Sequence, residues 1–273
     1  MIYSPPTKLV ASANGIPIFQ PEKLSKSPET FEAMRLLKPD VLVMVAFGQI
    51  LKKPVLEMAP HGVVNVHASL LPKYRGPAPI NWAIINGETE TGVTTMFSDP
   101  GVDTGSMLLK EKVAIGPDTN AEELGQALAE TGANLLVRTL EQLSIGAIKP
   151  EEQDDAQASY APLLKRDMGV LDWSKPARDI HNLVRGLYSW PGTQTGFEGG
   201  QLKITRTGPV DQVGLTSARP GEVIALSNHL LIACGPDGGE AIELVEVQPA
   251  NRARMSARDW ANGVRLKLGA QLG

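Results

Sequence analysis

Two apolar runs in the first quarter of the chain constrain its fold more than any other feature. Residues 40–46 are apolar after Asp40, and residues 63–67 consist of three valines together with Asn65 and His67. Apolar runs of this length are typical of strands in a parallel sheet that is covered on both faces. The sequence therefore predicts an α/β fold with a parallel sheet, in which residues 40–46 form a central strand and residues 63–67 a buried one.

The rest of the chain up to residue 148 alternates between helical and extended patterns. Helices are predicted at residues 7–14, 28–38, 79–86 and 119–146, and strands at residues 16–19 and 91–97. The last helix is predicted from a capping box, in which Thr119 and Glu122 would each satisfy a backbone amide at the helix start. A long amphipathic helix of this kind covers one face of a sheet. We therefore expect residues 1–148 to form the first domain.

The pattern changes after residue 148. Residues 149–159 are polar and acidic without periodicity, which is typical of a linker, and we place the linker at residues 149–168. Ser174 and Pro176 then begin a predicted helix. Short strands separated by turns follow at residues 201–207, 221–226, 229–234 and 240–247, before a last helix from Ser256 to about Leu268. This order predicts a small barrel over residues 169–273, similar to the OB-fold, which often binds oligonucleotides.

Composition excludes several classes of protein. Hydrophobic residues make up 42% of the chain and charged residues 21%, as in soluble globular proteins. No apolar run approaches the ~20 residues of a membrane span, and we find no signal-like segment, so we expect a cytoplasmic location and no membrane partner. Cys234 is the only cysteine, and none of the four histidines pairs with another His or Glu at metal-ligand spacing. We therefore expect neither a disulfide framework nor a metal.

Charge is distributed unevenly along the chain. The net charge is −4, but from Pro249 onward five basic residues stand against Asp259 alone, namely Arg252, Arg254, Arg258, Arg265 and Lys267. A local basic patch can contact a phosphate backbone even on a chain that does not bind nucleic acid in bulk. The alternative, on charge alone, is a solvated helix face.

Three polar residues are candidates for catalysis. Asn65 and His67 alternate along one strand, so their side chains share a face at its carboxyl end, where open α/β sheets place their chemistry. Asp103 lies 36 residues after His67, in the loop Gly101-Val102-Asp103-Thr104-Gly105. The strand predicted at residues 91–97 can bring this loop back to the end of the strand at residues 63–67. An amide donor, an imidazole and a carboxylate can stabilise a developing oxyanion and move a proton. They therefore suit acyl transfer to an amine without a covalent intermediate.

The motifs around these residues carry a specific resemblance. They are Asn65-Val66-His67-Ala68-Ser69-Leu70-Leu71-Pro72, Tyr74-Arg75-Gly76-Pro77-Ala78-Pro79, Gly101-Val102-Asp103-Thr104-Gly105, Leu171-Asp172-Trp173-Ser174, Trp190-Pro191-Gly192 and Gln248-Pro249-Ala250. Their order and spacing resemble those of the folate-dependent formyltransferases, most closely the family that acts on methionyl-tRNA. The likeness spans nearly the whole chain. It implies a Rossmann-like catalytic domain followed by an OB-like domain that binds tRNA.

The resemblance also implies a reaction. The formyl group of 10-formyltetrahydrofolate would pass to the α-amine of methionyl-initiator-tRNA, producing formylmethionyl-tRNA for translation initiation. Asn65 and protonated His67 would donate to the formyl oxygen as it becomes an oxyanion. Asp103 would keep His67 charged and help pass a proton from the amine to the leaving folate nitrogen.

Two segments are candidates for the folate site. Ser69, Leu70, Leu71 and Pro72 would shape it, as the resemblance implies, although they also fit an ordinary loop that ends at a proline. The segment Phe47-Gly48-Gln49-Ile50-Leu51 is the other candidate wall, because Gly48 allows the backbone to approach a flat pterin while Ile50 and Leu51 supply apolar contact. A merely structural role for this segment fits the residues about equally well.

Basic residues are the candidates for tRNA contacts. Arg75 would either position the tRNA end or brace its own loop. The other candidates lie near the carboxyl end of the chain and are Arg252, Arg254, Arg258 and Lys267. We expect the protein to act as a monomer.

The opening of the chain departs from the family's pattern. Met1-Ile2-Tyr3-Ser4-Pro5-Pro6-Thr7-Lys8 resembles a point just after the family's first strand-helix-strand unit and basic loop. Whether Met1 is the true start, and whether this chain is active, are therefore open. Two alternatives remain beside the reaction above: formyl transfer to a small amine, such as glycinamide ribonucleotide or an amino sugar nucleotide, and an inactive remnant that binds RNA.

Overall fold

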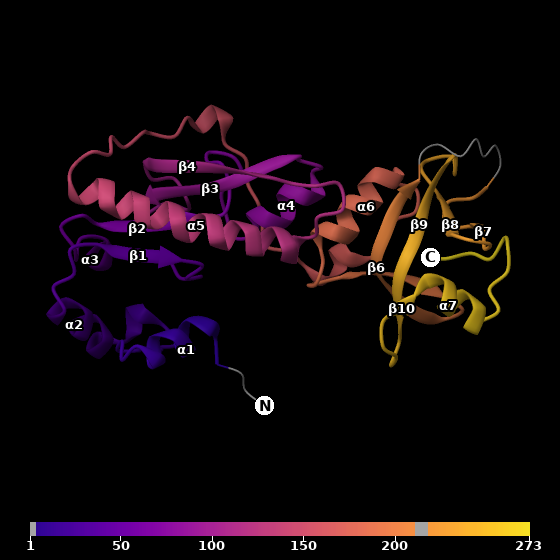
Figure 1. Cartoon of the computed structure of the whole chain (residues 1–273), viewed down its shortest axis with the longest axis horizontal. Helices are drawn as coiled ribbons and strands as arrows, with labels where there is room; N and C mark the ends of the chain where they lie inside the picture. The colour runs from indigo at the N-terminus through magenta and orange to yellow at the C-terminus, as the bar shows by residue number, and fades with distance from the viewer. Residues whose placement is uncertain (1–3, 211–217) are drawn as a thin grey trace.

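The first of two sheets contains the strands that the apolar runs predict. The computed structural model describes residues 4–210 and 218–273, and its first sheet has the order β1-β2-β3-β4, formed by Leu42–Val45, Val63–His67, Glu90–Phe97 and Met107–Ala114 (Figure 1). β1 and β2 are parallel, whereas β3 and β4 each run antiparallel to the preceding strand. The sheet is therefore mixed, with one parallel pair.

The prediction that residues 40–46 form a central strand is wrong for the residues that the structure describes. β1 lies at the edge of the sheet, next to β2 alone. Val43 is 44% exposed and Val45 58% exposed, so the second face of this strand is largely uncovered. The apolar composition identified the strand correctly but could not indicate its place in the sheet.

Five α-helices belong to the first domain in the described part of the chain. They are α1 (Pro6–Ala13), α2 (Pro28–Leu36), α3 (Lys53–Leu56), α4 (Pro79–Ile85) and α5 (Ala121–Ser144). Four of them had been predicted, with α3 missed because it is only one turn long. The strand predicted at residues 16–19 is not formed, and this segment leaves Ile16, Ile18 and Phe19 exposed.

Helix α5 covers one face of the sheet and forms the core with it. Leu124, Leu128 and Leu135 are buried against Val93 of β3 and Ile84 of α4. The capping box lies one residue later than predicted. Asn120, not Thr119, is the N-cap, and the Glu123 carboxylate accepts from the Asn120 backbone amide at 3.0 Å, because the Thr119 hydroxyl is used by the amide of Gly116.

The segment 149–168, predicted as a linker, is hydrogen-bonded to the first domain. Glu151 and Met107 exchange backbone hydrogen bonds of 2.7 and 2.9 Å, and the amide of Ala161 donates to the carbonyl of Arg75 at 2.7 Å. Two short 3-10 helices, Asp155–Gln157 and Arg166–Gly169, lie within or at the end of this segment. Figure 1 shows it running back along the first domain before it reaches the second.

In residues 169–210 and 218–273, the described part of the second domain, the chain forms a six-stranded antiparallel sheet and two α-helices. Its strands are β5 (Thr193–Phe197), β6 (Gly200–Val210), β7 (Val223–Ala225), β8 (Leu230–Cys234), β9 (Glu240–Pro249) and β10 (Met255–Ser256), in the order β5-β6-β9-β8-β7 with β10 beside β9. The four predicted strands are formed, which agrees with the expected small β-domain after an α/β domain. Cys234 is buried in β8, and burial raises the pKa of its thiol to about 12.

The helices of the second domain are α6 (Ala177–Gly186) and α7 (Ala257–Gly263). Ser256 caps α7 as predicted by accepting from the amide of Asp259 at 3.0 Å, although the helix ends at Gly263 and not near Leu268. Ser174 does not cap α6. The Glu240 carboxylate, distant in sequence, accepts from the Ala177 amide at 2.8 Å instead.

Helix α6 joins the two domains. The Arg185 guanidinium donates to the carbonyls of Gly116 and Thr119 before α5, at 3.2 and 3.1 Å. His181, also on α6, lies 2.9 Å from the Thr207 hydroxyl and 3.0 Å from the Pro117 carbonyl. These contacts fix the amino-terminal end of α5 against the second domain (Figure 1). None of the helices in the described ranges, 4–210 and 218–273, has the length and apolar character that a membrane crossing requires.

Candidate active site

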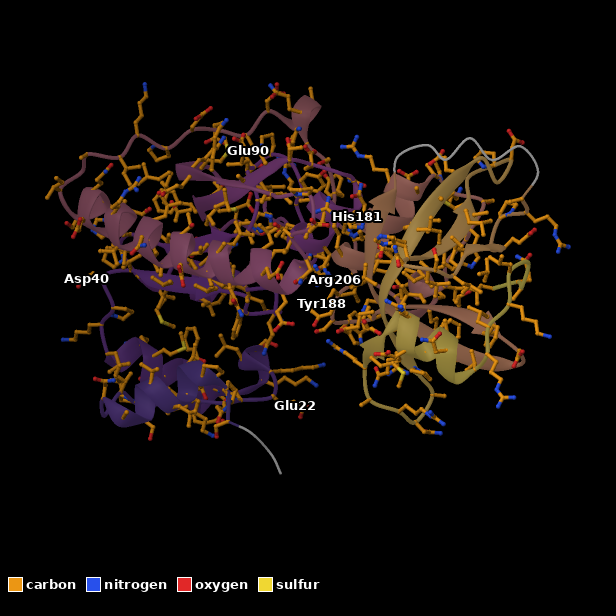
Figure 2. The ribbon with its side chains drawn as sticks, turned by 45° about the vertical axis from the view of Figure 1, so that its right-hand side comes forward. Glu22, Asp40, Glu90, His181, Tyr188 and Arg206 are labelled. Atoms are coloured by element: carbon orange, nitrogen blue, oxygen red, sulfur yellow. The ribbon has the colours of Figure 1, made fainter. Side chains whose placement is uncertain are left out.

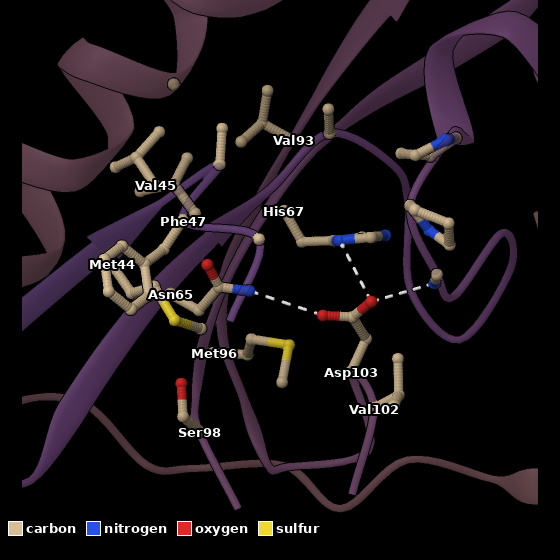
Figure 3. Close-up of a pocket in the computed structure, with 18 of the residues that line it drawn as sticks. Met44, Val45, Phe47, Asn65, His67, Val93, Met96, Ser98, Val102 and Asp103 are labelled. Atoms are coloured by element: carbon tan, nitrogen blue, oxygen red, sulfur yellow. Dashed lines mark hydrogen bonds and ion pairs between the residues drawn. The ribbon is translucent and has the colours of Figure 1, made fainter. Parts of the chain in front are cut away.

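A cavity of about 890 Å³ opens where β1 and β2 end. Six parts of the first domain line it: the end of β1 with the following loop, β2, the start of α4, β3, the loop at residues 98–103, and one side of α5. The carboxyl ends of parallel strands form such a crevice because the chain leaves them in loops. All three candidate catalytic residues line this cavity (Figure 3).

The three catalytic candidates converge as predicted. Asn65 and His67 are each 6% exposed on β2, and Asp103 reaches both from its loop. The Asn65 amide donates to Oδ1 of Asp103 at 3.4 Å, and Nδ1 of His67 lies 3.6 Å from Oδ2 (Figure 3). Both distances are longer than those of strong hydrogen bonds. The carboxylate therefore faces the imidazole and the amide across a narrow gap at the cavity floor.

Asp103 is held in place by its own loop. Its backbone has a φ of 55°, a left-handed conformation that Asp tolerates better than most residues. The Gly76 amide donates to Oδ2 at 2.8 Å, and Nε2 of Gln153 donates to the carbonyls of Asp103 and Gly105, both at 2.8 Å. Gln153 was missed by the sequence analysis, because it lies in the acidic segment that reads as a linker.

His67 has an acceptor near each ring nitrogen. Nε2 lies 2.9 Å from the Tyr74 carbonyl, which can only accept, so this nitrogen donates. Nδ1 faces Asp103. Two acceptors suit an imidazolium that carries a proton on each nitrogen. Tyr74 is itself held in place, because its hydroxyl donates to Glu88 at 2.8 Å. Burial raises the pKa of this phenol to about 12, so the hydroxyl keeps its proton and remains a donor.

The two candidate folate segments lie in different surroundings. Phe47, Gly48, Ile50 and Leu51 line the cavity, with Phe47 42% and Ile50 76% exposed. Ser69, Leu70, Leu71 and Pro72 lie outside the lining.

The loop from Ser69 to Pro72 supports the site from behind. Leu71 is buried with Met96 and Met107, and the Ser69 hydroxyl donates to the carbonyl of Lys73 at 2.6 Å. The Thr94 hydroxyl, on β3, donates to the Ser69 carbonyl at 2.7 Å. This turn therefore packs into the domain core, and Ala68 is the nearest residue before it that reaches the cavity.

Ser98 is a cavity residue that no sequence motif indicated. Its hydroxyl oxygen is buried, yet it has no hydrogen-bond partner among the described residues. Ser98 lines the cavity beside β2, and its amide donates to the Val63 carbonyl at 2.8 Å (Figure 3). A buried hydroxyl without a partner costs free energy, so this oxygen is available to a group that enters the cavity.

Arg75 braces its loop and does not present a free guanidinium. The residue is 2% exposed, Nε donates to Gln153 at 2.9 Å, and Nη2 donates to Asp155 at 2.8 Å. Because Gln153 holds the backbone of the Asp103 loop, Arg75 is linked to that loop through one side chain. Of the two roles that the sequence allowed, the structure therefore favours bracing over direct contact with tRNA.

The four basic candidates of the second domain are all exposed. Arg252 and Arg254 lie between β9 and β10, Arg258 lies on α7, and Lys267 follows that helix. Arg254 is the one that faces the domain boundary, where Nη1 donates to the Tyr188 hydroxyl at 2.7 Å. In residues 4–210 and 218–273 no group of three His, Cys, Asp or Glu residues is placed to hold a metal ion.

Two family models match most of the chain. The family described as "Formyl transferase" matches residues 2–140, and the one described as "Formyl transferase, C-terminal domain" matches residues 163–265. Two similar curated proteins are named methionyl-tRNA formyltransferase. That of Trichlorobacter lovleyi is 48% identical over 98% of this chain and 83% of its own length, and that of Solibacter usitatus is 50% identical over 98% and 84%.

Solved structures with a similar fold are more distant in sequence. The methionyl-tRNA formyltransferase from Clostridium thermocellum has a TM-score of 0.56 and 18% identity, covering 75% of this chain and 87% of that one. An N-formyltransferase from Helicobacter canadensis, in complex with folinic acid and dTDP-3-aminofucose, has a TM-score of 0.67 and 22% identity, covering 88% and 81%. At these identities the likeness concerns the fold alone.

Proposed function

Because the chain belongs to the methionyl-tRNA formyltransferases, within the formyl transferase family, we propose that it transfers the formyl group of 10-formyltetrahydrofolate to the α-amine of methionyl-initiator-tRNA. The observation that supports this most directly is the meeting of Asn65, His67 and Asp103 at the floor of one cavity. The product would be formylmethionyl-tRNA, which is used in translation initiation.

The cavity suits a folate co-substrate. Its volume of about 890 Å³ is in the range of small-molecule sites, and its outer wall is apolar from Val45 through Phe47 to Ile50. The Ser98 hydroxyl, which has no partner among the described residues, offers a polar contact in the cavity. We propose that Phe47, Gly48, Ile50 and Leu51 contact the folate, while the turn from Ser69 to Pro72 keeps the adjoining backbone in place.

The co-substrate supplies an activated formyl group, and the side chains of the chain itself supply charge stabilisation and proton movement. As the methionyl amine attacks the formyl carbon, negative charge develops on the formyl oxygen. The Asn65 amide donates to that oxygen, and so does Nδ1–H of the protonated His67 ring, because its 3.6 Å distance to Asp103 is longer than a strong hydrogen bond. Asp103, 3.6 Å from Nδ1, stabilises the charged ring, and in the proposed reaction it takes a proton from the attacking amine and delivers it to the leaving nitrogen.

Binding of tRNA is assigned to the second domain. Arg252, Arg254, Arg258 and Lys267 are exposed, and their charges can neutralise backbone phosphates. We propose that the domains divide at residues 1–148, 149–168 and 169–273, and that a monomer acts in the cytoplasm, since all three catalytic candidates come from one chain.

Formylation assays test the function. The protein should transfer the formyl group from 10-formyltetrahydrofolate to methionyl-initiator-tRNA, and transfer to glycinamide ribonucleotide or to an amino sugar nucleotide should be far slower. Efficient transfer to a small amine with none to tRNA would reject the proposed substrate. No transfer to any acceptor, together with intact tRNA binding, would identify an inactive RNA-binding protein.

A further inference from the structure

Three residues form an aromatic and basic surface on the second domain, which we call the boundary patch: Tyr188, Trp190 and Arg254. Besides donating to the Tyr188 hydroxyl at 2.7 Å, the Arg254 guanidinium lies 5.2 Å from the centroid of the Tyr188 ring, within the range of a cation–π contact. Trp190 is 54% exposed. The patch thus combines an exposed indole with a positive charge that is held by a tyrosine two residues earlier in the chain.

The boundary patch lies beside the catalytic cavity. Asn81 lines the cavity, and its side-chain amide donates to the carbonyl of Gly186 at 2.8 Å. Tyr188 and Trp190 follow Gly186 by two and four residues. Figure 2 shows Tyr188 where the two domains meet, below His181. The chain therefore passes directly from the edge of the cavity into the patch.

Arg254 is also close to the first domain. The hydrogen bond to Tyr188 raises the pKa of Arg254, and the charges of Glu246 and of Glu122 raise it further. Glu122 lies in the first turn of α5, one residue after its start, and Gly125 in the next turn lines the cavity. The guanidinium therefore remains charged at the boundary.

The exposure of Trp190 contrasts with the burial of the other two tryptophans of its domain. Trp173 and Trp260 are 5% and 4% exposed in the core of that domain, and the Trp82 indole donates to the Pro162 carbonyl at 2.8 Å. Within the described residues the Trp190 indole nitrogen forms no hydrogen bond. Exposed aromatic rings next to arginine are the usual platforms for unpaired nucleotide bases.

We propose that the boundary patch stacks the unpaired bases at the 3′ end of the tRNA, with Trp190 as the platform, so that the esterified methionine enters the cavity beside it. This inference rests on the proposed function. Arg254 lies next to the stacked bases and neutralises a neighbouring phosphate, and Arg252 and Arg258 extend the positive surface away from the cavity. The negative charges of Glu246 and Glu122 offset part of the positive charge of Arg254 at this surface. At the boundary patch, base stacking therefore contributes more to tRNA affinity than charge does.

Steady-state kinetics test the proposal. Trp190→Ala should raise the KM for methionyl-initiator-tRNA about tenfold, because one stacked base is lost. The kcat and the KM for the formyl donor should stay within about twofold, and Trp190→Phe should restore most of the affinity, since any aromatic ring can stack. Tyr160→Ala is the matched control, because Tyr160 is 68% exposed in the linker and outside the patch. An unchanged KM for tRNA in Trp190→Ala would overturn the proposal.

Fluorescence tests the contact without turnover. Intact initiator tRNA should quench tryptophan emission of the wild-type protein but not of Trp190→Phe, and the same tRNA with its unpaired 3′ nucleotides removed should quench much less. Equal quenching by both tRNAs would overturn the stacking site. The two hypotheses fail separately: wild-type protein that formylates no tRNA rejects the proposed function, whereas normal formylation with an unaffected Trp190→Ala variant rejects the stacking site alone.

Discussion

Two neighbouring strands of the first sheet have opposite surroundings. In β2, Val64 is fully buried, whereas Val43, its register partner in β1, is 44% exposed. The same holds beyond the strands, because β2 carries Asn65 and His67 at 6% exposure while β1 leads to Phe47 and Ile50 at 42% and 76%. The groups assigned to the reaction are thus buried and braced, and those assigned to binding lie on an exposed wall. Chemistry and binding should therefore respond to different substitutions.

The largest expected effect concerns the two walls of the cavity. His67→Ala and Asp103→Ala should each lower kcat by ~10²–10³ or more, since each removes charge stabilisation from the reaction, and should leave folate affinity within about tenfold. Phe47→Ala should do the reverse, raising the KM for the formyl donor about tenfold with kcat within a factor of about three.

Kinetics with all three variants measure this contrast, and thermal melting serves as the control for folding. A fall in kcat for Phe47→Ala as large as that for His67→Ala would show that reaction and folate binding are not assigned to separate walls of the cavity. Turnover retained in Asp103→Ala would remove this carboxylate from the mechanism.

The register pair offers a stability comparison within one sheet. Val64→Ala should lower the free energy of unfolding by roughly 2 kcal/mol, because it removes two methyl groups from a packed core. Val43→Ala should cost less than about 1 kcal/mol, since its side chain is partly in water already. Urea titrations of both variants give the values. Equal losses would mean that the outer face of β1 is covered in the protein as it exists in solution.

Local patterns in the sequence predicted strands β1, β2 and β3 of the first sheet and the three polar residues that meet in the cavity. Val63–His67 could be recognised from its valines, and Asn65, His67 and Asp103 from their motifs. The pattern could not reveal contacts between distant segments. Glu240 caps α6 from 63 residues away, in place of the predicted Ser174 cap. Arg75 donates to Gln153 from 78 residues away, a long-range contact that agrees with the bracing role among the two that the sequence left open.

The N-terminal side of the same sheet shows a second limit. Apolar composition predicts that a strand is buried, but burial depends on which segments pack against it. Residues 40–46 and 16–19 contain apolar residues that remain exposed in the structure. Ser98 is a polar residue for which the same limit holds. Nothing in the sequence around it indicates that the fold buries its hydroxyl beside the cavity.

Ser98→Ala should affect the stability and the affinity for the formyl donor differently, and both effects should be smaller than those above. Removing a buried hydroxyl without a partner should leave the free energy of unfolding unchanged or raise it by about 1 kcal/mol. The KM for the formyl donor should rise a few-fold if the hydroxyl contacts the folate, with kcat little changed. Melting and kinetics on one sample measure both. A loss of stability would show that Ser98 has a protein or water partner in solution.

The smallest expected effect is a dependence on pH at the domain boundary. Burial lowers the pKa of His181 below its ordinary value of 6.5, and Arg185 lowers it further, against the opposing effects of the Pro117 carbonyl and Asp118. The unfolded chain therefore binds more protons than the folded one as the pH falls below that value. The contribution of His181 to stability should be complete above about pH 6.5 and decline as the pH falls through the folded pKa.

Melting temperatures at about pH 7.5 and 5.5 check this sign. His181→Gln should reduce the difference between the two temperatures, because the site no longer titrates. His229→Gln is the control, since His229 is exposed and bonds only to Glu243 among the described residues. A wild-type protein that is more stable at the lower pH, with that gain lost in His181→Gln, would contradict the assignment.

The attachment of residues 151–161 to the first domain affects how this protein can be dissected. Their acidic, aperiodic sequence suggests an easy target for a protease, yet Glu151, Gln153 and Ala161 are bonded to the catalytic half of the chain. Limited digestion should therefore spare this stretch. An isolated catalytic domain that ends at residue 148 would lose the Gln153 clamp on the Asp103 loop, so a truncation intended to retain folate chemistry should end beyond Ala161.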